Sequence, residues 1–265
     1  GVVICRTRQE VFDALKSVMV DLKFGENAGR KVVMEEFMTG REVTVLAFCD
    51  GKTLLPMPAS QDHKKAYDGD KGANTGGMGA FAPTPYFSEQ DKNEFLQNIA
   101  LPTLKGLEKE GIVFKGVLYF GLMKTSGGLK VVEYNARFGD PETQVVLALL
   151  KSDLLEIVNA VIEGRLDCTE VLWSDETALT VVVADGGYPD NVVKGKEIRI
   201  GDLDGVRLLH AGTKLDGGRL KTNGGRVFNV VGVDESLDKA RKKVYGQIDK
   251  VGFEGARYRA DIGLV

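Results

Sequence analysis

The spacing of apolar residues in the N-terminal part of the chain predicts four strands and one amphipathic helix. Short apolar or alternating runs predict the strands at residues 1–5, 31–38, 42–49 and 53–57. After the first strand, Thr7 and Glu10 have the spacing of a helix capping box. The apolar face of that helix is expected at Val11, Phe12, Leu15, Val18 and Met19. Thr39-Gly40 and Asp50-Gly51 have the residue types of turns and are expected to join the later strands.

Residues 59–85 show no apolar period. A stretch of this length without regular structure inside a compact domain is usually functional or disordered, and its aromatic and apolar residues favour the functional alternative. It contains the glycine-rich run Asn74-Thr75-Gly76-Gly77-Met78-Gly79, whose successive backbone N–H groups are candidates for holding an anion. Asp62, His63 and Lys64 are candidates for polar contacts nearby. The alternative for the glycine-rich run is a flexible surface loop.

The middle of the chain is expected to contain helices on either side of a hairpin. Ser88 is predicted to cap a helix that runs towards Glu110, with an interruption near Pro102. Apolar runs at 113–124 and 129–134 predict a hairpin around a Ser-Gly-Gly turn. Further helices are expected as far as Ile162, broken near Ser152-Asp153 and closed by Gly164.

The composition changes after residue 165, where short apolar runs alternate with glycine turns. Strands are expected at 178–184, 197–200, 206–210 and 226–231, together with one helix at 234–251. This pattern predicts a smaller β-rich domain at residues 166–265, and the fold class of the whole chain is expected to be α+β.

Composition and charge exclude several classes of partner. The chain has 265 residues, 43% of them hydrophobic and 28% charged, and a net charge of -3, which gives no reason to expect nucleic acid or a membrane as a partner. Its three cysteines are too few and too far apart to suggest a disulfide framework. Its longest apolar run, residues 145–150, is too short to cross a bilayer, so the expected location is the cytoplasm.

Residues 131–142 combine a predicted strand end with a predicted helix start. Glu133 and Asn135 are two positions apart, so on a strand their side chains leave the same face, about 7 Å apart along the chain. Two hard oxygen donors on one face can hold Mg²⁺ beside a bound polyphosphate, and Arg137 is suited to a carboxylate or phosphoryl group. Asp140 is expected as the helix N-cap and Pro141 as the first helical residue. The alternative is an ordinary amphipathic strand, a turn and a capped helix.

Residues 35–42 are expected to join two strands. Backbone groups at Glu36 to Met38 are candidates for reading an adenine edge, and the carboxylate of Glu42 is a candidate for the ribose hydroxyls. A solvated hairpin is the alternative. The spacing of Ser, Cys, His and Asp residues does not favour covalent nucleophilic catalysis.

Taken together, four segments resemble the phosphoribosylamine–glycine ligase family, ATP-grasp ligases of purine biosynthesis. These segments are 35–42, 61–64 with 74–79, 133–142, and 210–213 with 222–227. The run Arg137-Phe138-Gly139-Asp140-Pro141-Glu142 is the most specific of them. The resemblance implies an ATP-grasp core, a partial lid at residues 1–35 and a larger part at 36–165, followed by the β-rich domain at 166–265.

The resemblance also implies a reaction and a set of site residues. The family uses ATP to activate glycine as an acyl phosphate, and the amine of 5-phosphoribosylamine then displaces phosphate. Carried over to this chain, it implies Mg²⁺ or Mn²⁺ at Glu133 and Asn135 and a catalytic role for Arg137. The implied ATP-binding residues are Glu35, Glu36, Phe37, Met38 and Glu42. The implied substrate-binding residues are Asp62, Lys64, Asn74, Thr75, Gly76, Gly77, Met78, Gly79, Gly139, Asp140 and Pro141.

Members of the family carry an N-terminal, Rossmann-like domain and a lysine that contacts the ATP phosphates, both before the position that corresponds to Gly1. We therefore expect this sequence to be part of a longer polypeptide. Two alternatives stay open, namely another ATP-grasp carboxylate–amine ligase and a non-catalytic nucleotide-binding fragment.

Overall fold

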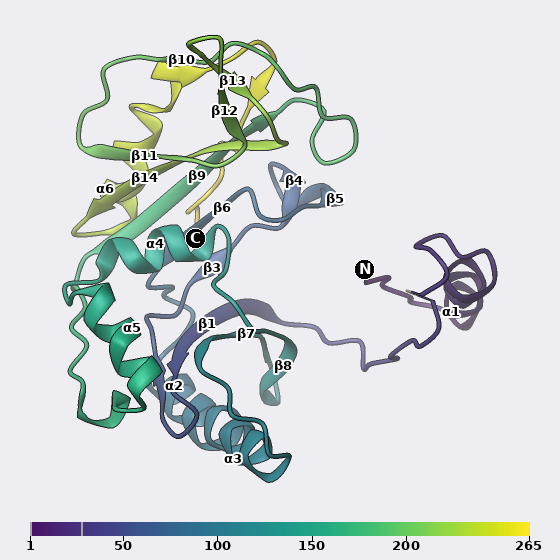
Figure 1. The fold of residues 1–265 in the computed structure, drawn as a ribbon. Helices are drawn as coiled ribbons and strands as arrows, with labels where there is room; N and C mark the ends of the chain where they lie inside the picture. Colours follow the sequence, from purple (N-terminus) through teal and green to yellow (C-terminus); the bar gives the residue numbers. More distant parts are fainter. Residues whose placement is uncertain (1, 28) are drawn as a thin grey trace. The chain divides into compact units, whose positions relative to one another are not determined.

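The computed structural model describes residues 2–27 and 29–265 (Figure 1). The chain forms two compact units, residues 1–40 and 41–265. None of the helices in the described residues is long and apolar enough to cross a membrane.

The first unit contains a single helical segment within its described residues, α1 (Arg8–Leu15) continued by the π-helix η1 (Lys16–Val20). The hydroxyl of Thr7 accepts a hydrogen bond from the N–H of Glu10 at 3.2 Å, as the capping pattern predicts. The predicted strands at 1–5 and 31–38 are wrong, since residues 2–5 and 31–39 form neither helix nor strand, and Gly1 lies outside the described residues. Within the described chain no strand pairs with these segments, and an unpaired strand leaves its N–H and C=O groups without partners.

The second unit begins with a four-stranded antiparallel sheet in the order β2-β1-β7-β8. Its strands are β1 (Arg41–Cys49), β2 (Leu54–Pro56), β7 (Gly116–Thr125) and β8 (Gly128–Asn135). The carboxylate of Asp50 closes the β1–β2 turn by accepting N–H groups of Lys52 and Thr53 at 2.9 and 2.7 Å. The predicted β7–β8 hairpin is confirmed, and Thr125 pairs with Gly128 across the turn.

One face of this sheet packs against α2 (Glu89–Phe95), the π-helix η2 (Leu96–Ala100) and α3 (Leu101–Lys109). The predicted cap is confirmed, because the hydroxyl of Ser88 accepts the N–H of Asp91 while the carboxylate of Asp91 accepts the N–H of Ser88. The expected interruption near Pro102 takes the form of the π-helix just before it. The proline is the second residue of α3 and follows this π-helix directly.

The other face is covered by α4 (Glu142–Val146), the 3₁₀-helix η3 (Leu147–Leu149) and α5 (Leu154–Glu163). Asp153 caps α5 and Gly164 ends it with a φ of 73°, so the predicted break and stop are confirmed. The prediction that Asp140 is the N-cap of α4 is wrong, and Pro141 occupies that position. The carboxylate of Asp140 instead bonds Gln144 at 2.8 Å and Arg226 at 2.7 Å.

A second sheet has the order β11-β14-β9-β6-β3, with β16 paired to the end of β9. Its strands are β3 (Gln61–Asp62), β6 (Gly79–Ala82), β9 (Thr177–Asp185), β11 (Val206–His210), β14 (Arg226–Asp234) and β16 (Ala256–Arg257). Helix α6 (Leu237–Tyr245) covers one of its faces. Three further strand pairs and two 3₁₀-helices complete the unit: β4 (Lys65–Tyr67) with β5 (Lys71–Asn74), β10 (Arg199–Ile200) with β15 (Val251–Gly252), β12 (Thr213–Asp216) with β13 (Arg219–Thr222), η4 (Leu166–Cys168) and η5 (Ile248–Lys250).

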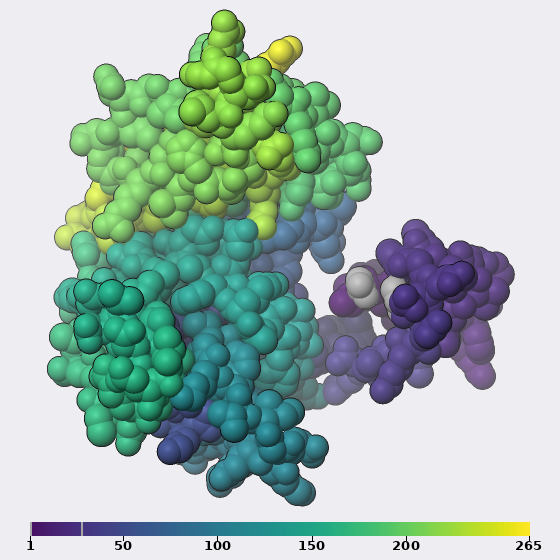
Figure 2. Space-filling view, viewed as in Figure 1, coloured from purple at the N-terminus to yellow at the C-terminus, as the bar shows by residue number. Residues whose placement is uncertain are grey.

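The expectation that residues 59–85 lack regular structure is wrong, because they form β3, β4, β5 and β6. These strands have two to four residues each, too few for an apolar period to be visible. They also join the two sheets, since Ala80 and Ala82 of β6 share a core with Val145 and Val146 of α4. In Figure 2 the teal middle of the chain lies directly against its green C-terminal part. The boundaries predicted after residues 35 and 165 stay predictions.

Candidate functional site

Polar side chains gather on the face of the first sheet that α4 covers in part. Thr44 of β1 lies opposite Gly121 of β7, which in turn lies opposite Glu133 of β8, while Tyr119 lies opposite Asn135. Directly opposed residues of antiparallel strands point to the same face. A Cβ atom on Gly121 would lie 2.9 Å from Cγ of Glu133, so the glycine leaves the room that the glutamate side chain occupies.

A buried series of side-chain hydrogen bonds lies beneath these groups. Tyr119 donates its hydroxyl proton to Oε1 of Glu142 at 2.8 Å, and its oxygen is 3.0 Å from the hydroxyl of Thr44. Glu142 is only 3% exposed, and burial raises the pKa of its carboxyl group. Burial and the neighbouring Glu142 also raise the pKa of Tyr119, which keeps its hydroxyl a donor. The first residue of α4 is thereby fixed to the middle of the sheet.

Next to these hydrogen bonds, Asp62 at the end of β3 and Lys64 just after it lie near Glu42 at the start of β1. Lys64 forms an ion pair with Glu42. Burial raises the pKa of Asp62 to about 7; Glu142 and Glu42 add to the rise, and Lys64 opposes it. Burial alone would lower the pKa of Lys64, but Asp62 and Glu42 raise it, so the lysine stays charged. Lys64 therefore interacts with four carboxyl groups, those of Glu42, Asp62, Glu133 and Glu142.

Glu133, Asn135 and Arg137 form a short hydrogen-bonded series at the end of β8. The amide nitrogen of Asn135 donates to Oε1 of Glu133 at 3.2 Å, and Arg137 donates to the amide oxygen of Asn135 at 3.3 Å. The donor set of one carboxylate and one amide oxygen fits Mg²⁺, which commonly uses few protein ligands and completes its shell with phosphate oxygens and water. No group of three or more His, Cys, Asp or Glu residues within the described chain has metal-binding geometry. The predicted pair is therefore compatible with a cation only if a ligand supplies further oxygens.

The glycine-rich run does not present the N–H groups expected of an anion-binding loop. Thr75 donates its N–H to the carbonyl of Lys64 at 2.7 Å, and Gly77 donates to the hydroxyl of Thr75 at 3.0 Å. Gly76 donates to the hydroxyl of Tyr188 at 3.0 Å, and Met78 to the carbonyl of His63 at 2.8 Å. Because these four donors already have protein acceptors, the expectation of an anion nest is wrong. Asn74 and Gly79 belong to β5 and β6.

The structure brings most of the predicted residues of the second unit together. Gly77 lies against Pro141, because a Cβ atom on Gly77 would be 2.3 Å from Cδ of Pro141. Gly139 is similarly close to the carboxylate of Glu142. Glu35, Glu36, Phe37 and Met38 belong to the first unit, where they lie in a segment without helix or strand, and their predicted contact with adenine stays a prediction.

Four residues that sequence reasoning does not place in the site contribute to it: Thr44, Tyr119, Glu142 and Arg226. Sequence reasoning missed Glu142 because an acidic residue is common at the positive end of a helix. It missed Tyr119 because this tyrosine lies within an apolar run that predicts a strand. Arg226 lies in one of the segments that carry the family resemblance, which is the available signal for it.

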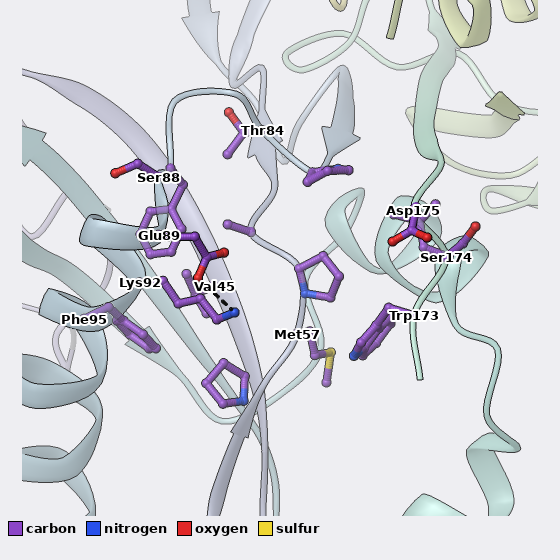
Figure 3. A pocket seen from close by; sticks show the side chains of 16 residues that line it. Val45, Met57, Thr84, Ser88, Glu89, Lys92, Phe95, Trp173, Ser174 and Asp175 are labelled. Atoms are coloured by element: carbon purple, nitrogen blue, oxygen red, sulfur yellow. Dashed lines mark ion pairs between the residues drawn. The ribbon is translucent and has the colours of Figure 1, made fainter. Parts of the chain in front are cut away.

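A separate cavity of about 400 Å³ lies on another part of the second unit (Figure 3). Trp173 and Met57 lie close together on one side of it, and the Glu89–Lys92 ion pair, 3.5 Å long, lies on the opposite side. None of the predicted site residues in the described chain lines it. The cavity therefore adds nothing to the chemistry of the polar group on the first sheet.

Comparison with known proteins shows which family this chain resembles. A family model described as phosphoribosylglycinamide synthetase, ATP-grasp (A) domain, matches residues 1–143, and the model of the C domain of the same synthetase matches residues 178–265. The phosphoribosylamine–glycine ligase of Brucella melitensis is 46% identical over 267 residues, which cover 99% of this chain and 62% of that protein.

Solved structures show the same relationship. The crystal structure of phosphoribosylamine–glycine ligase from Thermotoga maritima has a TM-score of 0.86 at 36% identity, covering 99% of this chain and 65% of that one. A biotin carboxylase domain from Hydrogenobacter thermophilus has a TM-score of 0.70 at 11% identity, covering 97% and 55%, and shows similarity of fold alone. The chain thus spans less than two thirds of the length of each of these relatives. By its match to the ATP-grasp domain over more than half its length, the chain belongs to the phosphoribosylglycinamide synthetase family.

Proposed function

We propose that the polypeptide containing this chain ligates glycine to 5-phosphoribosylamine at the expense of ATP, as a step of purine biosynthesis in the cytoplasm. The observation that carries the proposal is the series Glu133–Asn135–Arg137 beside the Lys64–Glu42 ion pair, all on one side of the first sheet. The names of relatives that match nearly the whole chain support the choice of substrates.

In this proposal ATP is held by Glu35 to Met38 at the adenine and by Glu42 at the ribose. The carboxylate of Glu42 already pairs with Lys64, and a carboxylate has enough acceptor positions to serve both partners. Glu133 and Asn135 would hold Mg²⁺, which neutralises phosphate charge when it is bound. Arg137 would stabilise the transferred phosphoryl group through its fixed fork of donors.

The reaction takes place in two steps. The glycine carboxylate attacks the γ-phosphoryl group of ATP, which gives glycyl phosphate and ADP. The amine of 5-phosphoribosylamine then attacks the glycyl carbonyl, phosphate leaves, and the nitrogen loses a proton to give the amide. Because the amine is already a nucleophile, the protein needs chiefly to position the reactants and stabilise charge. The run 74–79 and the turn 139–141 lie next to each other, which suits a role in positioning the two substrates.

The proposal is tested with the full-length gene product. Phosphate release should require ATP, glycine and 5-phosphoribosylamine together, and omission of either substrate should abolish it. Release with another carboxylate but not with glycine would assign a different carboxylate–amine ligase. Titration calorimetry of the 265-residue chain with ATP and Mg²⁺ separately tests nucleotide binding, and binding without turnover by the full-length protein would indicate a non-catalytic module.

A further inference from the structure

Arg226, the first residue of β14, connects three segments that are far apart in the sequence. Its Nη1 atom donates to the carbonyl oxygens of Gly76 at 2.8 Å and Asp140 at 2.9 Å, with a longer contact to Gly77 at 3.4 Å. Its Nη2 atom donates to Oδ2 of Asp140 at 2.7 Å. The side chain of Arg226 is 21% exposed and that of Asp140 is 50% exposed, so their ion pair is only partly shielded from water. A single guanidinium group thus holds the glycine-rich run and the 139–141 turn to the second sheet.

The surroundings of Arg226 leave little freedom for other arrangements. A Cβ atom on Gly76 would lie 3.0 Å from the guanidinium group, so the glycine allows the close approach of backbone and arginine. The N–H of Gly76 is bonded on its other side by Tyr188. The positive charge of Arg226 is already paired with the carboxylate of Asp140, so the position of the guanidinium does not depend on a bound anion.

The geometry also requires arginine in particular. Three backbone carbonyls and one carboxylate surround one planar group with donors in fixed directions, whereas a lysine ammonium is a compact charge on a flexible stem. Loss of the guanidinium would leave the carbonyl oxygens of Gly76 and Asp140 without this donor. The run and the turn would then be joined chiefly by the contact of Gly77 with Pro141.

We propose that Arg226 is a positioning residue of the ligase, which fixes the run 74–79 and the turn 139–141 in the relative arrangement that the substrates need. Arg226 acts through these two segments and does not itself touch a substrate. This inference rests on the proposed function for its kinetic consequence, while its structural part stands on the four contacts alone.

The test compares Arg226→Met and Arg226→Lys with wild type in the full-length gene product. Both variants should raise KM for glycine or 5-phosphoribosylamine by about 10- to 100-fold, because a small displacement of positioning groups costs that much, while KM for ATP stays near wild type. Arg219→Met is the matched control, since Arg219 also forms an ion pair, with Glu197 at 3.2 Å, but lies on the exposed hairpin of β12 and β13. The control should leave all three KM values unchanged.

Hydrogen exchange gives a readout that does not depend on activity. The N–H groups of Gly76, Gly77 and Met78 should exchange faster in Arg226→Lys than in wild type, with no change in α6. Unchanged exchange in this run, or equal changes of all three KM values together with general loss of stability, would overturn the positioning role. An inactive wild-type enzyme would refute the proposed function instead, and the exchange experiment would still decide whether Arg226 holds the two segments together.

Discussion

Replacement of Gly77 by alanine tests the contact between the glycine-rich run and the 139–141 turn. Gly77 has a φ of +110°, and a Cβ atom there would lie 2.3 Å from Cδ of Pro141 and 3.1 Å from its Cγ. Carbon atoms in good contact are about 3.5–4.0 Å apart, so the alanine methyl group would displace the turn by more than about 1 Å. The substitution therefore changes both the backbone conformation and the packing.

The expected magnitude follows from three contributions. An L-residue at this φ costs about 1–3 kcal/mol, and the steric overlap adds about 1–3 kcal/mol, as for other overpacked sites. Alanine also reduces the conformational entropy of the unfolded chain, which offsets about 0.4–1 kcal/mol of this loss of stability. Gly77→Ala should therefore lower the free energy of unfolding by about 1–6 kcal/mol.

Gly195→Ala is the matched control, since Gly195 has a φ of +87° and nothing lies within 4 Å of the position that an added methyl group would take. Urea unfolding of both variants and wild type gives the two free-energy changes by linear extrapolation. Gly77→Ala should be the more damaging by about 1–3 kcal/mol, which is the contribution of the overlap with Pro141. Equal losses in the two variants would refute the contact between the run and the turn.

Three further substitutions test the polar group on the first sheet. Tyr119→Phe should lower the free energy of unfolding by about 1–3 kcal/mol, because buried Glu142 loses its donor, and Tyr134→Phe, at an exposed hydroxyl, should cost less in the same urea experiment. Burial raises the pKa of Asp62 to about 7, so the folded protein keeps a proton that the unfolded chain releases near pH 4. The contribution of Asp62 to the free energy of unfolding therefore falls as the pH rises from about 4 to 7. In Asp62→Asn, the free energy of unfolding measured across this pH range should not show that fall. Glu133→Gln should greatly reduce Mg²⁺-dependent turnover of the full-length enzyme at an unchanged unfolding midpoint; an unaltered rate would remove Glu133 from the metal site.

Local sequence patterns predicted correctly those features of the structure that depend only on residues close together in the chain. The caps at Thr7 and Ser88 and the αL stop at Gly164 each depend on residues a few positions apart, and each occurs as predicted. The predicted break near Ser152-Asp153 also occurs, and there Asp153 caps α5. The β7–β8 hairpin is specified by its turn and by the apolar runs of its two strands. The same reasoning failed for residues 1–5 and 31–38, because apolar composition does not supply a strand partner.

The chemistry of the site depended on contacts between distant residues. The placement of Glu133 and Asn135 on one face was visible in the sequence, because residues two positions apart in a single strand point to the same side. The raised pKa of Asp62 was not visible, because it results from burial and from the nearby carboxyl groups of Glu42 in β1 and Glu142 in α4. Nor could the sequence show that the N–H groups at 75–78 are already bonded, or that Asp140 pairs with Arg226 and does not cap a helix.

By itself, therefore, the sequence determined the family, most of the helices and hairpins, and the residue types available for catalysis. Only the tertiary structure decided which of these residues share one environment. The physical reason is that burial, pKa and hydrogen-bond satisfaction depend on groups brought together across long stretches of chain, such as the 86 positions between Asp140 and Arg226.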